Sequence, residues 1–263
     1  MASHPTNRLN FLLLLLSIPA SLTSRSETNF LKWDSIDFSF ESDTERESWL
    51  TSGKFIPQNV AISDIKVYKD SLFFSIPRDL DGVPATLATL PYNSTSPGFN
   101  SSFAVLMPFP SWEKNRLKKC SAFQNAQTIE IDQFDRLWVF DSGSATKSKS
   151  CRPKLVILDL NRNKTVRSYE FSSRVVKRTE GKFSAVALGC LSKHDCWAYV
   201  FEPNGGKIIV YNYAMNKSWY VRHPTMRSDT LDTKVHNVTK GKGCRLGFHG
   251  IFQYNSCLFF CRQ

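Results

Sequence analysis

Short runs of β-branched and aromatic residues, separated by turn residues, extend through most of the chain. Ile62 to Tyr68 and Leu72 to Ile76 are two such runs, and Lys69-Asp70 lies between them as a turn. Runs of this length that end at turn residues are typical of strands. No long segment repeats apolar residues at helical spacing, so the pattern predicts an all-β protein.

Two segments of the chain resemble each other. KLVILDLNRNKT (Lys154 to Thr165) matches KIIVYNYAMNKS (Lys207 to Ser218) at an offset of 53 residues, and DRLWVF (135–140) resembles DCWAYVF (195–201). Each unit is therefore expected to hold four strands: 126–132, 135–140, 154–160 and 165–171 in one, 183–188, 196–202, 206–213 and 218–222 in the next, and 60–68, 71–77, 84–90 and 103–107 in an earlier one. Such repetition favours a β-propeller over the alternative, a β-sandwich.

The first 24 residues predict a secretory signal peptide. A polar start with Arg8 precedes the apolar run Phe11 to Leu16, and small residues follow it. The run is shorter than the roughly 20 apolar residues that span a bilayer, and no other stretch is long enough. We therefore expect a secreted, extracellular protein without a membrane span, whose fold begins at about residue 25.

Cysteines and glycosylation sequons agree with export. The chain has seven cysteines, and five Asn-x-Ser/Thr sequons lie at Asn93, Asn100, Asn163, Asn216 and Asn237. Disulfides are the expected state of cysteines outside the cell, and the odd number leaves at least one thiol. N-glycosylation of the sequons is expected in the same compartment.

The net charge of +11 predicts a basic, solvated surface. The more specific alternative is that this charge attracts anionic ligands or surfaces. Nucleic acid is not expected as a partner, because no nucleic-acid-binding motif accompanies the charge. No Gly-x-Ser-x-Gly, His-Glu-x-x-His or phosphate-binding glycine motif is present either. The sequence thus indicates no catalytic residue and no cofactor.

Two groups of polar residues are candidate sites. Asp132, Asp135 and Asp141 are interpreted as turn residues rather than a carboxylate cluster, and Ser142-Gly143 as a structural turn. Zinc-capable residue types occur near the end of the chain, but without the tight cysteine pairs of structural zinc sites. Disulfides or an unfolded end are therefore favoured over a metal site for His236, Cys244, His249, Cys257 and Cys261.

Several segments resemble the yellow / major royal jelly protein family of insects, and they occur in that family's order from about Trp33 to about His223. The motifs that carry the resemblance are GKFIPQNVAISDIKVYKDSLFFSIPR (53–78), DGVPATL (81–87), PSWEKNRLKKC (110–120), IDQFDRLWVFDSG (131–143) and CRPKLVILDL (151–160). The resemblance implies a six-bladed propeller that is secreted and often glycosylated. It also implies two disulfides, Cys120 with Cys151 and Cys190 with Cys196.

At 53 residues per unit, we expect this chain to cover roughly the first four blades, within residues 25–223, and to leave the ring unclosed. Residues 224–263 diverge from the family, apart from a faint likeness at LGFHGIFQ (246–253). We expect this segment to form at most an incomplete blade and to pack poorly.

The resemblance implies binding of a small amine or a catechol-type ligand, linked to pigmentation and melanin chemistry. Because the first strand of each blade lines the central channel, Gln127 and Ser184 are candidates for a site at the channel mouth. One alternative is an enzyme that converts dopachrome, and another is a structural or nutritive protein. The sequence predicts neither the ligand's identity nor the oligomeric state.

Overall fold

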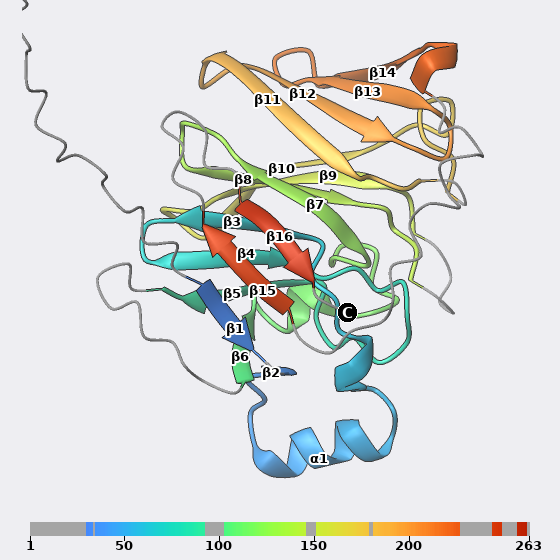
Figure 1. Cartoon of the computed structure of the whole chain (residues 1–263). Helices are drawn as coiled ribbons and strands as arrows, with labels where there is room; N and C mark the ends of the chain where they lie inside the picture. The colour runs from blue at the N-terminus through green and yellow to red at the C-terminus, as the bar shows by residue number, and fades with distance from the viewer. Residues whose placement is uncertain are drawn as a thin grey trace, which may run out of the picture.

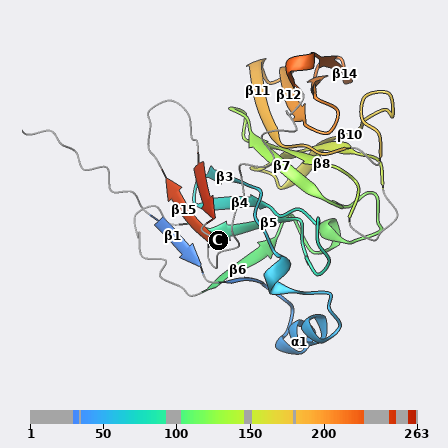
Figure 2. The same ribbon diagram turned by 45° about the vertical axis from the view of Figure 1, so that its right-hand side comes forward.

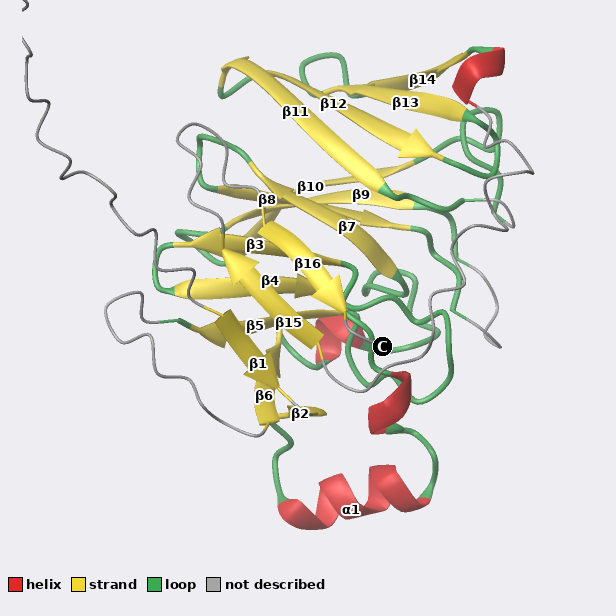
Figure 3. Ribbon diagram, viewed as in Figure 1, coloured by secondary structure: helices red, strands yellow, loops and turns green. Residues whose placement is uncertain are grey.

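The computed structural model describes residues 30–33, 35–92, 103–145, 151–178, 181–226, 244–248 and 257–261. The described residues are mostly strands with few helices, which makes the chain an all-β protein (Figure 3). Residues 1–24, Asn93, Asn100, Asn237, His236 and His249 lie outside the described residues, so the predictions made for them are not addressed by the structure. Within the described ranges, no helix is long and apolar enough to cross a membrane.

Three consecutive sheets correspond to the three predicted units (Figure 1). Each runs antiparallel through four strands in chain order, and the first sheet gains a fifth, parallel strand at its outer edge. The first sheet contains β2 (Ser35–Phe38), β3 (Asp64–Tyr68), β4 (Ser71–Ser75), β5 (Leu87–Pro91) and β6 (Phe103–Pro108). The second contains β7 (Ala126–Ile131), β8 (Arg136–Asp141), β9 (Lys154–Asp159) and β10 (Lys164–Glu170), and the third contains β11 (Ala185–Ser192), β12 (Asp195–Glu202), β13 (Lys207–Asn212) and β14 (Lys217–Arg222).

The three sheets lie side by side with their first strands adjacent (Figures 1 and 2). Strand β7 contacts both β3 and β11, so the opening strands of the three sheets line one inner side. All three start at the same end of the molecule, because each sheet repeats the same antiparallel order. The described sheets form an arc and not a closed ring.

The second sheet is buried on both faces. Leu137 and Val139 of β8 pack toward the first sheet, whereas Trp138 and Phe140 pack toward the third. This double burial explains why the β8 sequence is a continuous apolar run and does not alternate with polar residues. Burying one such side chain stabilises the fold by about 1.5–3 kcal/mol. The two interfaces of the second sheet therefore account for much of the hydrophobic core.

One feature differs from the sequence-based expectation. A helix, α1 (Asp43–Thr51), lies between β2 and β3, although the sequence shows no helical spacing of apolar residues there. None of its residues is buried. Its N-cap is Ser42, whose side chain accepts a hydrogen bond from the Glu45 amide, and Trp49 packs on Phe40 and Trp112. Local capping and the two aromatic contacts of Trp49 therefore form this helix, rather than an amphipathic pattern.

Residues 224–263 are described only in part, and the expectation that they pack poorly stays a prediction. Within the described residues, β15 (Cys244–Phe248) and β16 (Cys257–Cys261) join β1 (Phe30–Trp33) in a three-stranded sheet. The backbone register places Cys244 opposite Cys261.

Candidate ligand-binding site

A pocket of about 320 Å³ lies where the three sheets meet, at the starting ends of their first strands. The segment before β3 and the loop after β4 form one side, β7 forms the floor, and the segment that leads into β11 forms the other side. The residues that define its chemistry are Ile62, Pro77, Asp79, Gln127, Lys182 and Phe183. The volume lies within the usual range for small-molecule sites.

Gln127, one of the two residues predicted from the sequence, lines this pocket. It lies at a β-bulge in β7, because the pairing with β8 shifts between Ala126 and Thr128. Bulges often re-aim a side chain. The Gln127 side-chain oxygen accepts a hydrogen bond of 2.7 Å from the Phe183 amide, which fixes the orientation of the carboxamide. Among the described residues its Nε2 has no hydrogen-bond partner, although Gln127 is only 5% exposed.

Ser184, the other predicted residue, is exposed and does not line the pocket. Its hydroxyl lies 3.5 Å from the Phe201 carbonyl oxygen, at the start of the third sheet. Its neighbour Phe183 lines the pocket instead and packs edge-to-face on Phe140 of the second sheet. The alternation of side chains along a strand does not predict which of these two adjacent residues faces the pocket. Both residues precede β11 and do not belong to a strand.

Two charged residues lie at the rim of the pocket. Asp79 and Lys182 are both exposed, and Asp79 accepts a hydrogen bond of 3.3 Å from the Asn125 side chain. The sequence analysis missed both residues, because they belong to loops and only the fold brings them together. For Asp79, the available signal was its position directly after the family-like motif that ends at Arg78.

A buried arginine supports the loop that carries Asp79. The Arg78 guanidinium donates to five backbone carbonyl oxygens, and burial lowers the pKa of Arg78 to about 10. Its own amide donates to Asn125. Asn115 lies in the same network, accepting from the Thr86 and Leu87 amides and donating to two carbonyls. This network joins the first sheet to the segment that enters β7, next to the pocket residue Asp79.

Asp141 is fully buried and binds backbone, so it has no free oxygen for chemistry. Its carboxylate accepts from the amides of Gln124, Asn125 and Gly143. The Lys154 ammonium lies 3.7 Å away; burial lowers the pKa of Lys154, and the Asp141 charge opposes that shift. Asp141 therefore anchors the entry to β7 and is more than a turn residue. Ser142 is buried beside it, and its amide donates to the Asn125 carbonyl.

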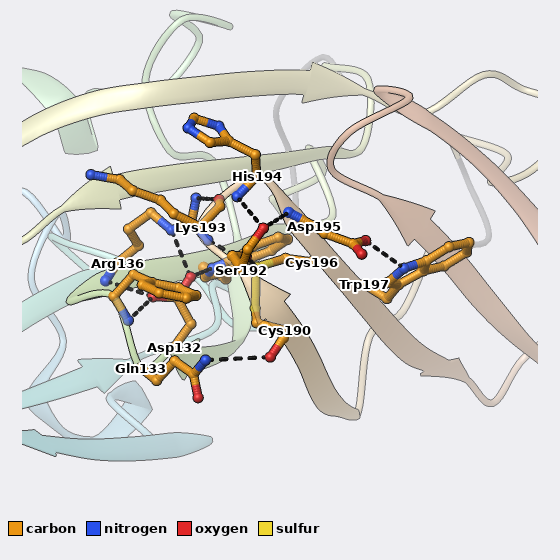
Figure 4. The surroundings of a disulfide bond; sticks show 12 residues. Asp132, Gln133, Arg136, Cys190, Ser192, Lys193, His194, Asp195, Cys196 and Trp197 are labelled. Atoms are coloured by element: carbon orange, nitrogen blue, oxygen red, sulfur yellow. Dashed lines mark hydrogen bonds and ion pairs between the residues drawn. A yellow bond between two sulfur atoms is a disulfide. The ribbon is translucent and has the colours of Figure 1, made fainter.

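Asp132 forms a second buried anchor, shown in Figure 4. Its oxygens accept from the Phe134 and Arg136 amides, from Arg136 Nε at 2.6 Å, and from the Trp138 indole at 2.7 Å. Arg136 then donates to the Lys193 carbonyl and to Cys196 Sγ, which connects the second sheet to the hairpin of the third.

The structure pairs Cys190 with Cys196 and Cys120 with Cys151, the two disulfides that the resemblance implies. Asp132 and the two sulfurs of the first pair lie within 4.8 Å of one another, a spacing compatible with a metal ion. The sulfurs are bonded to each other, however, and the Asp132 oxygens already accept four hydrogen bonds. This cluster is therefore structural and not a metal site.

The described residues contain no nucleophile–base pair at the pocket, and neither described histidine, His194 nor His223, lines it. The pocket contains an apolar wall, the unpaired Nε2 donor of Gln127 and the carboxylate of Asp79.

The described residues define an all-β protein of repeated four-stranded sheets with a pocket at their junction. The family model described as major royal jelly protein matches residues 124–251. Major royal jelly protein 7 of Apis mellifera is 28% identical over 221 residues, and protein yellow of Drosophila melanogaster is 30% identical over 194 residues. These alignments cover 81% and 71% of this chain. The chain belongs to the yellow / major royal jelly protein family.

The chain spans less than half the length of these relatives, since the alignments cover 48% of the royal jelly protein and 35% of the yellow protein. Among solved structures, the computationally designed Ika8 protein has a TM-score of 0.35 at 9% identity, over 62% of this chain and 37% of that one. U3-55K has a TM-score of 0.34 at 11% identity, over 76% of this chain and 52% of that one. Likeness at this level carries no argument about function.

Proposed function

We propose that this chain is a secreted, propeller-forming protein that binds a small aromatic amine or catechol-type ligand in the pocket at the junction of its sheets. The propeller is supported by the repeated four-stranded sheets and by the contacts of β7 with β3 and β11. In a propeller the first strand of each blade lines the central channel. The pocket then lies at one mouth of that channel.

Secretion is supported by the two disulfides and by the N-terminal signal pattern. Disulfides persist in oxidising compartments and are rare in the cytosol. Their formation requires that the chain reach such a compartment before or while it folds.

Gln127 is the observation that carries the ligand assignment. Because the Phe183 amide donates to its oxygen, Nε2 remains as an unpaired donor at the pocket and calls for an oxygen acceptor on the ligand. Asp79 at the rim offers a carboxylate to a cation. Phe183, Pro77 and Ile62 form the apolar wall between these two groups. A ring with a hydroxyl at one end and an ammonium at the other matches all three features, which links the site to the phenolic chemistry of melanin.

The test is calorimetry of the secreted protein with serotonin, dopamine and benzyl alcohol as a neutral control. We expect heat of binding with the two amines and none with the control. Asp79→Asn should weaken amine binding about tenfold or more, since a hydrogen bond to a charged group contributes about 1.5–3 kcal/mol. Asp70→Asn is the matched control, because Asp70 is an exposed carboxylate in the β3–β4 turn at the other end of the sheet.

The Gln127→Glu variant tests the contact at the hydroxyl end of the ligand separately from the contact at its ammonium end. This change keeps an oxygen that accepts from the Phe183 amide and removes the Nε2 donor, so it should weaken binding of dopamine more than binding of a simple alkylamine. A folded preparation that gives no heat with either amine would refute the proposal. No observation in the described residues favours the alternative, dopachrome conversion. That alternative predicts that dopachrome absorbance falls faster with the folded protein than with heat-killed protein.

A further inference from the structure

The third sheet has one face that no other described sheet covers. Strands β11 to β14 lie at one end of the row of sheets (Figure 1). One face of this sheet, with Ala198, Val200 and Ile209, is buried in the core shared with the second sheet. The opposite face, called the outer face, carries Tyr199 and Val221, which are 45% and 50% exposed. Contiguous apolar surface of this kind marks an interaction site.

The outer face is apolar from its first strand to its fourth. One row across the four strands, taken in register, consists of Ala187, Tyr199, Val210 and Trp219. The charged residues of this face, Asp195 and Lys217, lie at the strand ends, and Asp195 accepts a hydrogen bond of 3.2 Å from the Trp197 indole. Another apolar face can therefore pack on the centre of the outer face without burying a charge there.

The outer face repeats the pattern of an interface inside the molecule. At the 53-residue offset, Ile208 and Val210 correspond to Leu155 and Ile157 of the second sheet. Leu155 and Ile157 are fully buried in the core between the second and third sheets. The outer face is thus built from the positions that pack one sheet on the next, which favours a second sheet as its occupant.

A second copy of this chain supplies such a sheet through the same face. At the other end of the row, the outer side of the first sheet is already covered, because Trp33 packs edge-to-face on Phe74 in a core cluster that includes Phe38. Among the described sheets, each copy therefore has its free apolar face on the third sheet. Contact through the same face of two copies is isologous and closes at a dimer.

The outer face has a low side and a high side that complement each other. Strand β11 contributes the small residues Ala185, Ala187 and Gly189. Strands β12 and β14 contribute Trp197 and Trp219, whose rings meet edge-to-face at 5.7 Å. A two-fold axis parallel to the strands lays β11 of one copy over β14 of the other. Small residues then lie against large ones on both sides of the axis.

We propose that the outer face of the third sheet is a homodimer interface, in which two copies pack third sheet on third sheet about a two-fold axis parallel to the strands. The proposal goes beyond the proposed function and does not rest on the ligand. Its driving force is the burial of the aromatic residues of β12 and β14.

Substitution of Gly189 tests the interface without straining the single chain. Gly189 is exposed, and a Cβ added there would meet no atom within 4 Å. The register places Gly189 and Lys217 at one level of the sheet, so the axis brings Gly189 over Lys217 of the other copy. Gly189→Arg adds a like charge there and should raise the dissociation constant of the dimer about tenfold or more. Gly189→Glu adds the opposite charge and should raise it less.

Sedimentation equilibrium of the full secreted chain measures the dimer. We expect the mass of the unaltered protein to rise toward twice the monomer mass as its concentration increases. Gly189→Arg should shift this rise to higher concentration. Val166→Arg is the matched control and should leave the rise unchanged, because Val166 is an exposed apolar residue of β10 in the second sheet.

A mass that stays at the monomer value at every concentration would overturn the proposal and leave the outer face to another part of the polypeptide. A mass that rises beyond the dimer would overturn the two-fold contact, since an isologous contact closes at two copies. Equal weakening by Gly189→Arg and Gly189→Glu would overturn the axis that lays β11 over β14. Ligand calorimetry has no bearing on any of these outcomes.

Discussion

Buried charged residues in this protein hold loops and hairpins in place. Asp141 accepts from three backbone amides at the entry to β7, and Asp132 accepts from two amides, an arginine and an indole. The sequence interpretation took both as turn residues rather than members of a carboxylate cluster. It did not foresee their burial, because the donors come from segments that only the fold brings together.

Asp132→Ala should be strongly destabilising. The Arg136–Asp132 ion pair is 2.6 Å long and both side chains are only 1% exposed. Removing one partner of a buried pair leaves an uncompensated charge and costs about 3–5 kcal/mol. The matched control is Glu113→Gln, which breaks an exposed ion pair with Lys119 and should leave the unfolding free energy nearly unchanged.

Denaturant unfolding of both variants measures the difference. Equal losses of unfolding free energy would show that the Asp132 cluster contributes no more than a surface ion pair. Unchanged slopes of the unfolding curves are required for the comparison, because a changed slope signals a different unfolded state.

At the scale of elements, the repeat in the sequence predicted the strands of the second and third sheets to within a few residues. The prediction succeeded because β8 and β9 are buried on both faces, whereas β12 and β13 bury the face that packs on the second sheet, and such strands have a strong apolar signal. It failed at α1, whose formation depends on the Ser42 cap and the aromatic contacts of Trp49. It placed Gln127 correctly on an inner strand, but not the bulge that sets its side chain.

The two disulfides should differ in their contribution to stability. Cys120–Cys151 closes a separation of 31 residues, and Cys190–Cys196 closes one of 6 within a single hairpin. In the chain-entropy account, the longer loop contributes about 4 kcal/mol and the shorter one about 2 kcal/mol. The double variants Cys120→Ser/Cys151→Ser and Cys190→Ser/Cys196→Ser, compared by denaturant unfolding, test this order.

The hairpin disulfide has one complication, because Arg136 also donates to Cys196 Sγ. A serine hydroxyl at this position can accept the same hydrogen bond, so the serine variant isolates the covalent link. A larger loss from the hairpin pair than from the long-range pair would contradict the entropy argument.

At the scale of the whole molecule, the third sheet differs from the second in having one uncovered face. Trp138 of the second sheet is fully buried against the third sheet. Tyr199 and Val221 lie on the face of the third sheet that points away from the second, and they are 45% and 50% exposed. The described arc therefore ends in an apolar surface built like the interfaces inside it.

Uncovered apolar surfaces of this kind promote association and bind apolar dyes. The double variant Tyr199→Lys/Val221→Lys should therefore lower the fluorescence of an apolar dye bound to the folded protein, and should reduce concentration-dependent association in sedimentation. Its unfolding free energy should change by less than about 0.5 kcal/mol, since exposed substitutions remove little burial. Met215→Lys is the matched control, because Met215 is 52% exposed in the β13–β14 turn, away from this face. If the double variant binds as much dye as the unaltered protein, the face is covered in solution, and the arc of three sheets is not the surface that the protein presents.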